Sequence, residues 1–366
     1  MITTSGFKQE IQKLGKSSIL LGNRSMPLQL VLFVTSRCNM RCDHCFYLDE
    51  INDSSRTELS IEQIETLAKE LGGLNWVALS GGEPYLRKDL VEINQAFYKH
   101  SRPNIMSHVT NGYYPDRISD MTGEMAASCS KSKVLVIFSL DGLQETHERI
   151  RHSPGSFDLV RESIQSVQKH QSDYPNLETG VVITAQDNNQ EELIPLIEYI
   201  ESKLMPDGIY INLHRDHTQP SNVIVDPQVL MHYQEAVAFY ESIRTKKNLK
   251  GRKFLDRLLD GKNKLQKRTI TKIAEENTYQ LPCLAGKVSV VVDELGNVYA
   301  CELLKDPMGN LKNQSFKEIW FSEQARRLSD SITQDKCYCT HECAMSSSLL
   351  FNPGKLFQSM ISGVMT

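Results

Sequence analysis

Several features are missing from this 366-residue sequence. It contains no run of 18 or more apolar residues, which excludes an ordinary transmembrane helix. Its first 22 residues lack a basic segment followed by an apolar one, so we expect no secretory signal and a cytoplasmic protein. Lys and Arg (41) do not outnumber Asp and Glu (45), and the net charge of −4 argues against a nucleic-acid partner. Internal repeats and low-complexity tracts are also lacking.

Cysteine, by contrast, is plentiful. The nine residues form an odd number in a large chain without an export signal, which disfavours a disulfide framework. Eight of them fall into two groups, a pattern that favours metal or iron–sulfur ligation. Cys129 stands apart in a polar stretch, where a free surface or buried thiol is expected and a hydrogen-atom donor is the alternative. The first group is Cys38, Cys42 and Cys45, and the second is Cys283, Cys301, Cys337, Cys339 and Cys343.

Apolar and amphipathic segments alternate about six times over residues 28–215. This pattern predicts an α/β fold of parallel strands with helical crossovers, whose site lies in the turns after the strands. The predicted strands are 28–34, 76–79, 105–109, 133–140, 179–184 and 208–213, and the predicted helices are 60–71, 90–100, 157–169 and 191–203.

The last 140 residues have a different composition. Residues 227–244 suggest a helix, and residues 287–301 a hairpin that turns at 294–297. Residues 244–272 hold 12 Lys or Arg against two Asp, which indicates either a solvated helical face or a site for an acidic partner. The tail, residues 349–366, is apolar enough to pack on the core, cover the site or touch a membrane surface.

Cys38, Cys42 and Cys45 have the spacing C-x3-C-x2-C directly after the first predicted strand. Structural zinc sites and structural [4Fe–4S] clusters normally close with four protein ligands. Three thiolates with one open position are therefore typical of a reactive site. Zinc with His44 as a fourth ligand is the alternative, although His44 is confined between Cys42 and Cys45.

This spacing resembles the signature of the radical S-adenosylmethionine (SAM) enzymes, with His44 at the position where an aromatic residue is usual. Further segments resemble motifs of that family in the same order along the chain. They are Ser80-Gly81-Gly82-Glu83-Pro84, Thr110-Asn111-Gly112, Ser139-Leu140-Asp141-Gly142 with His147 and Arg151, and Gly155-Ser156-Phe157.

The resemblance implies a partial (β/α)6 TIM-like barrel and a role for each matching residue. Cys38, Cys42 and Cys45 are expected to hold a [4Fe–4S] cluster whose fourth iron binds SAM. Arg151 is expected to pair with the SAM carboxylate, which suits a guanidinium. Asn111 and Asp141 are as well explained by a role in shaping their loops. The full set of expected SAM contacts is Tyr47, Gly81, Gly82, Glu83, Pro84, Asn111, Ser139, Asp141 and Arg151.

The second cysteine group resembles the small α+β SPASM/twitch extension of peptide-modifying radical SAM enzymes. Cys283 and Cys301 fit the pattern C-x9–15-G-x4-C, but C-x-C-x3-C replaces its longer continuation. Five thiols cannot ligate two clusters, so the resemblance implies one auxiliary [4Fe–4S] cluster. Its expected ligands are Cys283, Cys301 and two of the remaining three, with Cys343 favoured by the C-x3-C spacing; a structural zinc site is the alternative.

These motifs divide the chain into five expected regions. They are an N-terminal extension (1–27), a radical SAM partial barrel (28–220), a helical basic linker (221–280), an auxiliary-cluster domain (281–346) and an apolar tail (347–366).

For the substrate, the alternation of residues 209–214 predicts that Asn212 and His214 face the barrel lumen, with Arg215 at the end of the strand. Asp216 and His217 follow as weaker candidates.

Three functions remain open at this point. One is a peptide or protein maturase that cleaves SAM to a 5′-deoxyadenosyl radical, abstracts a hydrogen atom and carries out a two-electron oxidation. The second is an enzyme that dehydrogenates, rearranges or epimerises a sugar, aminocyclitol or other metabolite, and the third a non-catalytic iron–sulfur scaffold or electron carrier. The resemblance implies an electron donor such as flavodoxin or ferredoxin. The short segment before the first strand leaves no room for a leader-binding domain and leans towards a compact enzyme.

Overall fold

The computed structural model describes residues 25–53, 55, 57–215, 220–247, 254–352 and 354–355. Asp216 and His217 lie outside the described residues, as do most of the expected N-terminal extension and the end of the apolar tail. The same holds for residues 248–253 in the middle of the basic segment.

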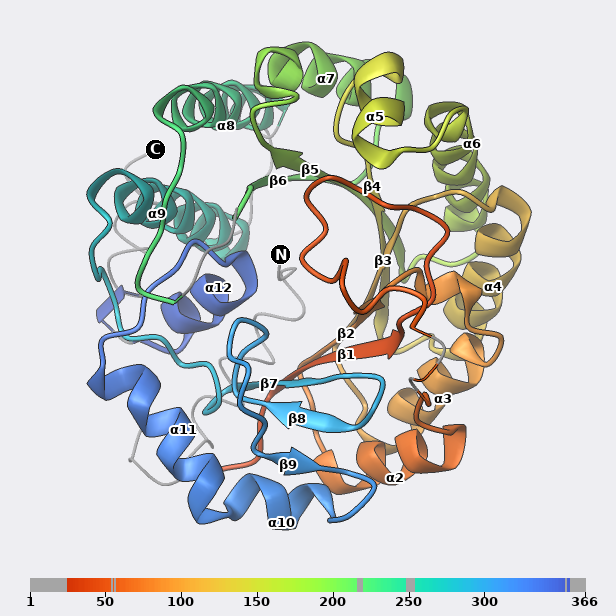
Figure 1. Cartoon of the computed structure of the whole chain (residues 1–366). Helices are drawn as coiled ribbons and strands as arrows, with labels where there is room; N and C mark the ends of the chain where they lie inside the picture. Colours follow the sequence, from red (N-terminus) through yellow and green to blue (C-terminus); the bar gives the residue numbers. More distant parts are fainter. Residues whose placement is uncertain are drawn as a thin grey trace.

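One nine-stranded sheet organises the molecule, in the order β6-β5-β4-β3-β2-β1-β7-β8-β9. Its first six strands are parallel to their neighbours, as the alternation predicted. Figure 1 shows this part of the sheet curving around a central space with helices on its outer side, which is the expected partial barrel. The six strands are β1 (Gln29–Thr35), β2 (Trp76–Gly81), β3 (Ile105–Thr110), β4 (Lys133–Ser139), β5 (Leu177–Ala185) and β6 (Gly208–Leu213).

Most of the crossover helices lie where they were predicted. Helix α2 (Ile61–Leu71) begins with the expected capping box, in which Ser60 and Gln63 satisfy each other's backbone amides. Helices α3 (Leu90–His100) and α6 (Ser156–Lys169) also match. The predicted helix 191–203 is instead a 3₁₀ turn (Gln190–Glu192), α7 (Leu193–Tyr199) and a π-helical turn (Ile200–Leu204).

Two helices had no clear signal in the sequence. Helix α4 (Pro115–Ser128) alternates small, polar and apolar residues without a strong stripe. Helix α5 (Gln144–Arg151) has a single apolar residue, Ile150, and otherwise charged or polar side chains. Their helical form depends on packing against neighbouring elements, because their own apolar periodicity is weak.

The C-terminal part continues the barrel. The predicted hairpin is present as β7 (Ser289–Val292) and β8 (Asn297–Tyr299), with Gly296 at φ +87° in its turn, and β9 (Gly309–Asn310) follows. Strand β7 is parallel to β1 and pairs with it from Gln29 to Leu32. Among the residues that the structure describes, the cysteine-rich region therefore shares one sheet with the barrel.

Helices complete the C-terminal part. They are α8 (Pro227–Lys247), α9 (Phe254–Glu276), α10 (Phe316–Phe321), α11 (Glu323–Gln334) and α12 (Glu342–Leu350). Figure 1 shows α9 and α12 on the side where the curved sheet is open, between β6 and β7. In this position they can form the wall that two further strands would supply in a complete barrel.

The core follows the alternation of the strands. In β1, Leu30 and Leu32 are buried in the main hydrophobic core, while Val31 and Phe33 face the inner space. Within the described residues, no helix is both long and apolar enough to span a bilayer.

Candidate active site

A cavity of about 420 Å³ lies inside the curved sheet. Inward-facing side chains of all six parallel strands line it, together with the loops after β1 and β2 and residues of α9 and α12. Tyr210 and Asn212 of β6 and His214 directly after it line the cavity, while Ile209 and Ile211 are buried; Leu213 at the end of the strand is also buried but reaches the lining. The alternation predicted for this strand is therefore observed.

The three cysteines of the first group line this cavity from the loop after β1. Asn52 holds the loop, because its side chain accepts from the Cys38 amide at 2.9 Å and donates to the Cys38 carbonyl at 2.8 Å. The pKa of Cys38 is raised to about 11, mainly by burial and in smaller part by the nearby charges of Glu83, Cys42 and Cys45. The amide of Met40 is hydrogen-bonded to the Cys38 thiol and acts in the opposite sense.

His44 does not join these thiols. Its Nδ1 lies 3.4 Å from Gln186 Nε2, and its Nε2 lies 3.7 Å from Asp141 Oδ2. Burial lowers the pKa of His44 to about 4, so the ring is neutral. Among the described residues, no three His, Cys, Asp or Glu side chains converge as ligands of a single metal ion. A [4Fe–4S] cluster binds each thiolate at a different iron, so its ligands need not converge in this way.

Gly81 and Gly82 are required by the close approach of the loop after β2 to the cysteine loop. A Cβ atom would lie 2.4 Å from the Thr35 carbonyl oxygen at Gly81 and 2.2 Å from the Arg37 carbonyl oxygen at Gly82. The amides of Gly82 and Glu83 donate to these same two carbonyl groups, both at 2.8 Å. The two glycines therefore position the cysteine loop, in addition to lining the cavity.

The Glu83 side chain is a structural centre of the site. It is 1% exposed and accepts hydrogen bonds from the amide of Tyr85 at 3.1 Å, the Thr110 hydroxyl at 2.9 Å and the amide of Asn111 at 2.7 Å. Burial raises the pKa of Glu83 to about 7. These bonds join the turn after β2 to the turn after β3.

Asn111 continues the connection to the cysteine loop. The Asn111 side-chain nitrogen Nδ2 donates to Asn39 Oδ1 at 2.8 Å, and its side-chain oxygen Oδ1 accepts from the Tyr113 backbone amide at 3.0 Å. Both contacts support the loop-shaping alternative, although Asn111 also lines the cavity.

Arg151 lies against both an acid and a cysteine. Its Nε donates to Asp141 Oδ2 at 2.8 Å, its Nη2 donates to the same oxygen, and its Nη1 lies 3.4 Å from Cys42 Sγ. Burial is the largest single effect on Asp141 and opposes its ionisation, but the Arg151 charge and the Thr184 amide, with smaller effects of neighbouring histidines, together outweigh it and lower the pKa of that carboxyl. Asp141 also accepts from the Thr184 amide at 2.9 Å. Asp141 thus orients Arg151, and the guanidinium is placed beside a thiol of the first group.

The expected SAM contacts divide by their exposure to the cavity. Gly81, Gly82, Glu83, Asn111, Ser139 and Arg151 line it, whereas Tyr47, Pro84 and Asp141 do not. The Tyr47 hydroxyl donates to Glu294 in the turn of the β7–β8 hairpin, and its ring packs on Phe33 with centroids 5.2 Å apart. Its amide is hydrogen-bonded to the Cys45 thiol.

In the second cysteine group, four thiols lie near enough for the charge of one to shift the pKa of another. The charge of Cys283 raises the pKa of Cys301, Cys337 and Cys339, after the larger effect of burial. Cys339 acts in the same way on Cys301, and Cys337 on Cys339. The structure therefore gathers Cys283, Cys301, Cys337 and Cys339.

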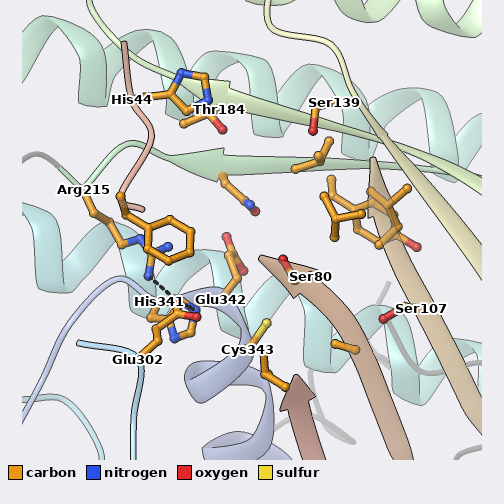
Figure 2. A pocket seen from close by; sticks show the side chains of 18 of the residues that line it. His44, Ser80, Ser107, Ser139, Thr184, Arg215, Glu302, His341, Glu342 and Cys343 are labelled. Atoms are coloured by element: carbon orange, nitrogen blue, oxygen red, sulfur yellow. Dashed lines mark hydrogen bonds and ion pairs between the residues drawn. The ribbon is translucent and has the colours of Figure 1, made fainter. Parts of the chain in front are cut away.

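Cys343 lines the main cavity. Figure 2 shows its sulfur facing the same space as Ser80 and Glu342. The C-x3-C spacing favours Cys343 as an auxiliary ligand, and this stays a prediction; its thiol is hydrogen-bonded to the His341 ring, and the His341 amide is hydrogen-bonded to the Cys339 thiol. Cys129 is fully buried in the core and is not among the cavity-lining residues, which argues against a hydrogen-atom donor.

The cysteines of both groups share a local environment suited to iron–sulfur ligation. The amide two residues further along is hydrogen-bonded to the thiol at Cys38, Cys45, Cys283, Cys301 and Cys339. Burial disfavours the thiolates, while these amides and a bound metal's positive charge favour them. The residues present therefore fit the two clusters that the motifs imply.

Of the far wall of the cavity, the sequence predicted Arg215 but not its partners. Arg215 Nη1 lies 3.2 Å from Glu302 Oε1, and His341 Nε2 lies 2.5 Å from the same oxygen (Figure 2). Helices α9 and α12 add Lys262, Gln266, Lys267, Glu342 and Ser346 to the lining. One signal for this wall was present in the sequence: Lys262 and Gln266 are four residues apart, which places them on the same face of a helix.

Comparisons with known proteins agree with both halves of the chain. The family model described as "Radical SAM superfamily" matches residues 32–200, and the model described as "Iron-sulfur cluster-binding domain" (SPASM) matches residues 283–344. Fe-coproporphyrin III synthase of Methanosarcina barkeri is 28% identical over 52% of this chain, and the match spans 45% of that relative's length.

Two other relatives match over most of their length. The antilisterial bacteriocin subtilosin biosynthesis protein AlbA of Bacillus subtilis is 24% identical over 90% of this chain and 72% of its own. AdoMet-dependent heme synthase of Methanosarcina barkeri is 25% identical over 85% of this chain and 87% of its own.

Solved structures share the fold. Native anSMEcpe with bound AdoMet superimposes with a TM-score of 0.61 at 19% identity, covering 84% of both chains. Streptococcus suis SuiB bound to its precursor peptide SuiA gives a TM-score of 0.58 at 16% identity, covering 86% of this chain and 69% of SuiB.

Proposed function

Because the chain carries a radical SAM domain followed by a SPASM iron–sulfur domain, with a SAM-binding [4Fe–4S] cluster, an auxiliary cluster and SAM as cofactors, we propose that it is a peptide-modifying radical SAM maturase. One observation carries this proposal. Cys38, Cys42 and Cys45 line the same cavity as Gly81, Ser139 and Arg151, so cluster ligands and SAM contacts meet in one enclosed space.

The proposed ligand assignment follows the geometry. Cys38, Cys42 and Cys45 hold the SAM-binding cluster, and Cys283, Cys301, Cys337 and Cys339 hold the auxiliary cluster. When bound, the first cluster and SAM together supply reductive cleavage of SAM to a 5′-deoxyadenosyl radical.

The chain's own residues prepare this chemistry. Arg151, oriented by Asp141, presents remaining donor capacity to the SAM carboxylate, and Ser139 presents a hydroxyl from the end of β4. The curved sheet, α9 and α12 line the cavity and limit the access of water to the reacting atoms.

The proposed net reaction is a two-electron oxidation. The substrate would lose two hydrogens in all, as one hydrogen atom, one electron and one proton, leaving a double bond or a new crosslink, and the auxiliary cluster would supply the acceptor for that electron. Four thiols close the auxiliary cluster, so its proposed role is electron transfer. An external donor such as flavodoxin or ferredoxin supplies the first electron, and the proposed compartment is the reducing cytoplasm.

A peptide substrate is supported by AlbA, which is named for bacteriocin biosynthesis, and by the fold shared with SuiB bound to a precursor peptide. A small-molecule substrate is the second candidate. It is supported by the heme synthase, whose match extends over 87% of its length, and by the modest cavity volume of about 420 Å³.

Anaerobic reconstitution tests the proposal. We expect about eight iron atoms per chain, because each of two [4Fe–4S] clusters contributes four. Replacing Cys38, Cys42 and Cys45 together by Ala should halve this number and abolish SAM cleavage after reduction. Wild-type protein that holds its iron but does not cleave SAM would overturn the enzyme assignment.

Product mass tests the type of reaction. A two-electron oxidation lowers the substrate mass by two hydrogens and consumes about one SAM per product. An unchanged mass with one solvent deuterium incorporated would instead indicate epimerisation. In that case Cys343, which lines the cavity, becomes the candidate hydrogen donor in place of the buried Cys129.

A further inference from the structure

The turn of the β7–β8 hairpin lies against the segment that joins β1 to α2. The Glu294 carbonyl in this turn accepts from the Leu59 amide at 2.8 Å, and the Tyr47 hydroxyl donates to Glu294 Oε2. A Cβ atom at Gly296 would lie 3.0 Å from Leu59 Cδ2, so the approach is close. Glu294 falls in the stretch matched by the iron–sulfur cluster-binding model, and Tyr47 in the stretch matched by the radical SAM model. One bond therefore joins the auxiliary region directly to the loop of the first cysteine group.

The Asp293 side chain fixes the turn that carries Glu294. Its Oδ1 accepts from the amides of Leu295 at 3.0 Å and Asn297 at 2.8 Å, and its Oδ2 accepts from the Asn297 side chain at 2.8 Å. Glu294 is 1% exposed, although it is not a fixed position of any motif in the sequence. A buried carboxyl group needs polar partners, and the Tyr47 hydroxyl is one of them.

Tyr47 connects this turn to a thiol of the first cysteine group. The Tyr47 amide is hydrogen-bonded to the Cys45 thiol, and the Tyr47 ring packs on Phe33 with centroids 5.2 Å apart. Tyr47 is buried and does not itself line the cavity, whereas Cys45, Phe46 and Phe33 do. A shift of Tyr47 would therefore move groups that face the cavity.

Packing alone does not explain the hydroxyl group of Tyr47. The ring belongs to a small apolar cluster with Phe33 and Val291, and a phenylalanine ring would fill the same space. Apolar contacts are not directional, whereas a hydrogen bond has a preferred distance and angle. The bond to Glu294 therefore specifies where residue 47 lies relative to the hairpin.

We propose that Glu294 is a positioning residue of the SAM site, which acts through the Tyr47 hydroxyl. By holding Tyr47, Glu294 sets the position of the amide that reaches the Cys45 thiol and of the adjoining backbone. The inference rests on the SAM site of the proposed function and does not depend on the substrate. It assigns part of that site to the auxiliary region, so the hairpin contributes to SAM binding as well as to the auxiliary cluster.

A double-mutant cycle tests the bond. Tyr47→Phe removes the hydroxyl, Glu294→Leu removes its acceptor, and a third protein carries both changes. Equilibrium dialysis against anaerobically reconstituted protein measures the affinity for SAM, and electron paramagnetic resonance records the change that SAM causes in the spectrum of the reduced protein. We expect each single variant to bind SAM about tenfold more weakly, the scale of one lost buried hydrogen bond. The double variant should bind no more weakly than the weaker single variant, because all three lack the same bond.

Two further variants separate positioning from packing. Glu294→Gln keeps an acceptor oxygen for the Tyr47 hydroxyl and should keep most of the affinity for SAM. Tyr299→Phe is the matched control, because the Tyr299 hydroxyl donates to Asp293 Oδ2 at 3.4 Å within the same hairpin, and its SAM affinity should equal that of the wild type. Iron content and thermal unfolding are measured for every variant, and SAM affinities are compared at equal iron content.

Two results would overturn the proposal. One is a wild-type SAM affinity and spectrum in both Tyr47→Phe and Glu294→Leu, and the other is a pair of losses that add in the double variant, as independent effects do. If Glu294→Leu does not fold, the comparison of Tyr47→Phe with Tyr299→Phe decides alone. Wild-type protein that binds SAM without cleaving it would contradict the proposed function and leave this cycle valid, because the cycle measures binding.

Discussion

At the scale of single residues, two cysteines of the second group show that neighbours in the sequence can contact different parts of the structure. Cys339 and Cys343 are separated by three residues, yet Cys339 lies with Cys283 and Cys301 while Cys343 lines the barrel cavity. The start of α12 between them separates the two thiols, because a helix turns its side chains about its axis. The choice among Cys337, Cys339 and Cys343 as auxiliary ligands is therefore a matter for experiment.

This difference can be measured through the auxiliary cluster. We expect Cys337→Ala to lower the iron content of the reconstituted protein and to alter the spectrum of the auxiliary cluster, because it removes one of four ligands. Cys343→Ala should leave both unchanged if its thiol serves only the barrel cavity that it lines. Mössbauer and electron paramagnetic resonance spectroscopy distinguish the two clusters. The reverse pattern would support the assignment that the C-x3-C spacing favours.

Glu83 gives a prediction about pH. Burial raises its pKa from 4.5 to about 7, so between these values the folded protein keeps a proton that the unfolded chain releases. The stability of the wild-type protein should therefore fall as pH rises through this window, by up to about 3 kcal/mol. The Glu83→Gln side chain cannot ionise, so the stability of this variant should depend less on pH. Its overall stability is lower, because the new side-chain NH2 group would face the Asn111 backbone amide, and both are donors.

Thermal unfolding of the reconstituted protein from pH 5 to pH 8 provides the measurement. Glu92→Gln is the matched control, because Glu92 is exposed on α3 and should leave the pH slope unchanged. Identical slopes for the wild type and Glu83→Gln would show that Glu83 keeps an ordinary pKa.

At the scale of elements, the site depends on how closely neighbouring turns approach. The turn after β2 packs on the cysteine loop through two amide–carbonyl bonds, and Glu83 ties it to the turn after β3. Arg87 supports the same region, donating to the carbonyls of Val34 and Leu59 at 2.6 Å each. The cysteine loop is thus positioned mainly by contacts from other strands.

Gly82→Ala tests this arrangement. The added methyl group would lie 2.2 Å from the Arg37 carbonyl oxygen, so the cysteine loop must move. We expect a loss of about 1–3 kcal/mol in stability, about half the iron and most of the SAM cleavage. Gly73→Ala is the control, because a methyl group there meets no atom within 4 Å. Full iron loading of Gly82→Ala would show that the loop adapts without cost.

At the scale of the whole molecule, the cysteine-rich region is built into the barrel. Strand β7 pairs with β1, Tyr47 bonds to Glu294 in the hairpin, and Trp320 Nε1 donates to the Ser25 carbonyl at 2.8 Å. Helix α12 lines the cavity from the same region. The two halves therefore stabilise each other, and the auxiliary cysteines are held in a fixed relation to the SAM site.

Removal of residues 281–366 should consequently destabilise the barrel as well. The deletion exposes the edge of β1 and opens the cavity, and an exposed parallel edge favours aggregation. We expect no folded monomer by gel filtration and far-ultraviolet circular dichroism. The full-length Cys283→Ala/Cys301→Ala protein is the control, since it loses the auxiliary cluster and keeps the strand pairing. A monomeric, SAM-cleaving fragment would contradict this dependence.

The sequence by itself determined the parallel strands, the order of the SAM motifs and the presence of two cysteine groups. These features are local: period-two and helical apolar patterns, capping residues and short spacings act over a few residues. The capping box at Ser60 and the inward-facing Tyr210, Asn212 and His214 are examples.

Only the tertiary structure decided that Cys343 faces the barrel, that β7 extends the sheet beside β1, and that Lys262 and Arg215 line one cavity. Each of these facts joins segments that are far apart in the chain. Such contacts depend on how elements pack around the open side of the sheet, and no local pattern of residues encodes that packing.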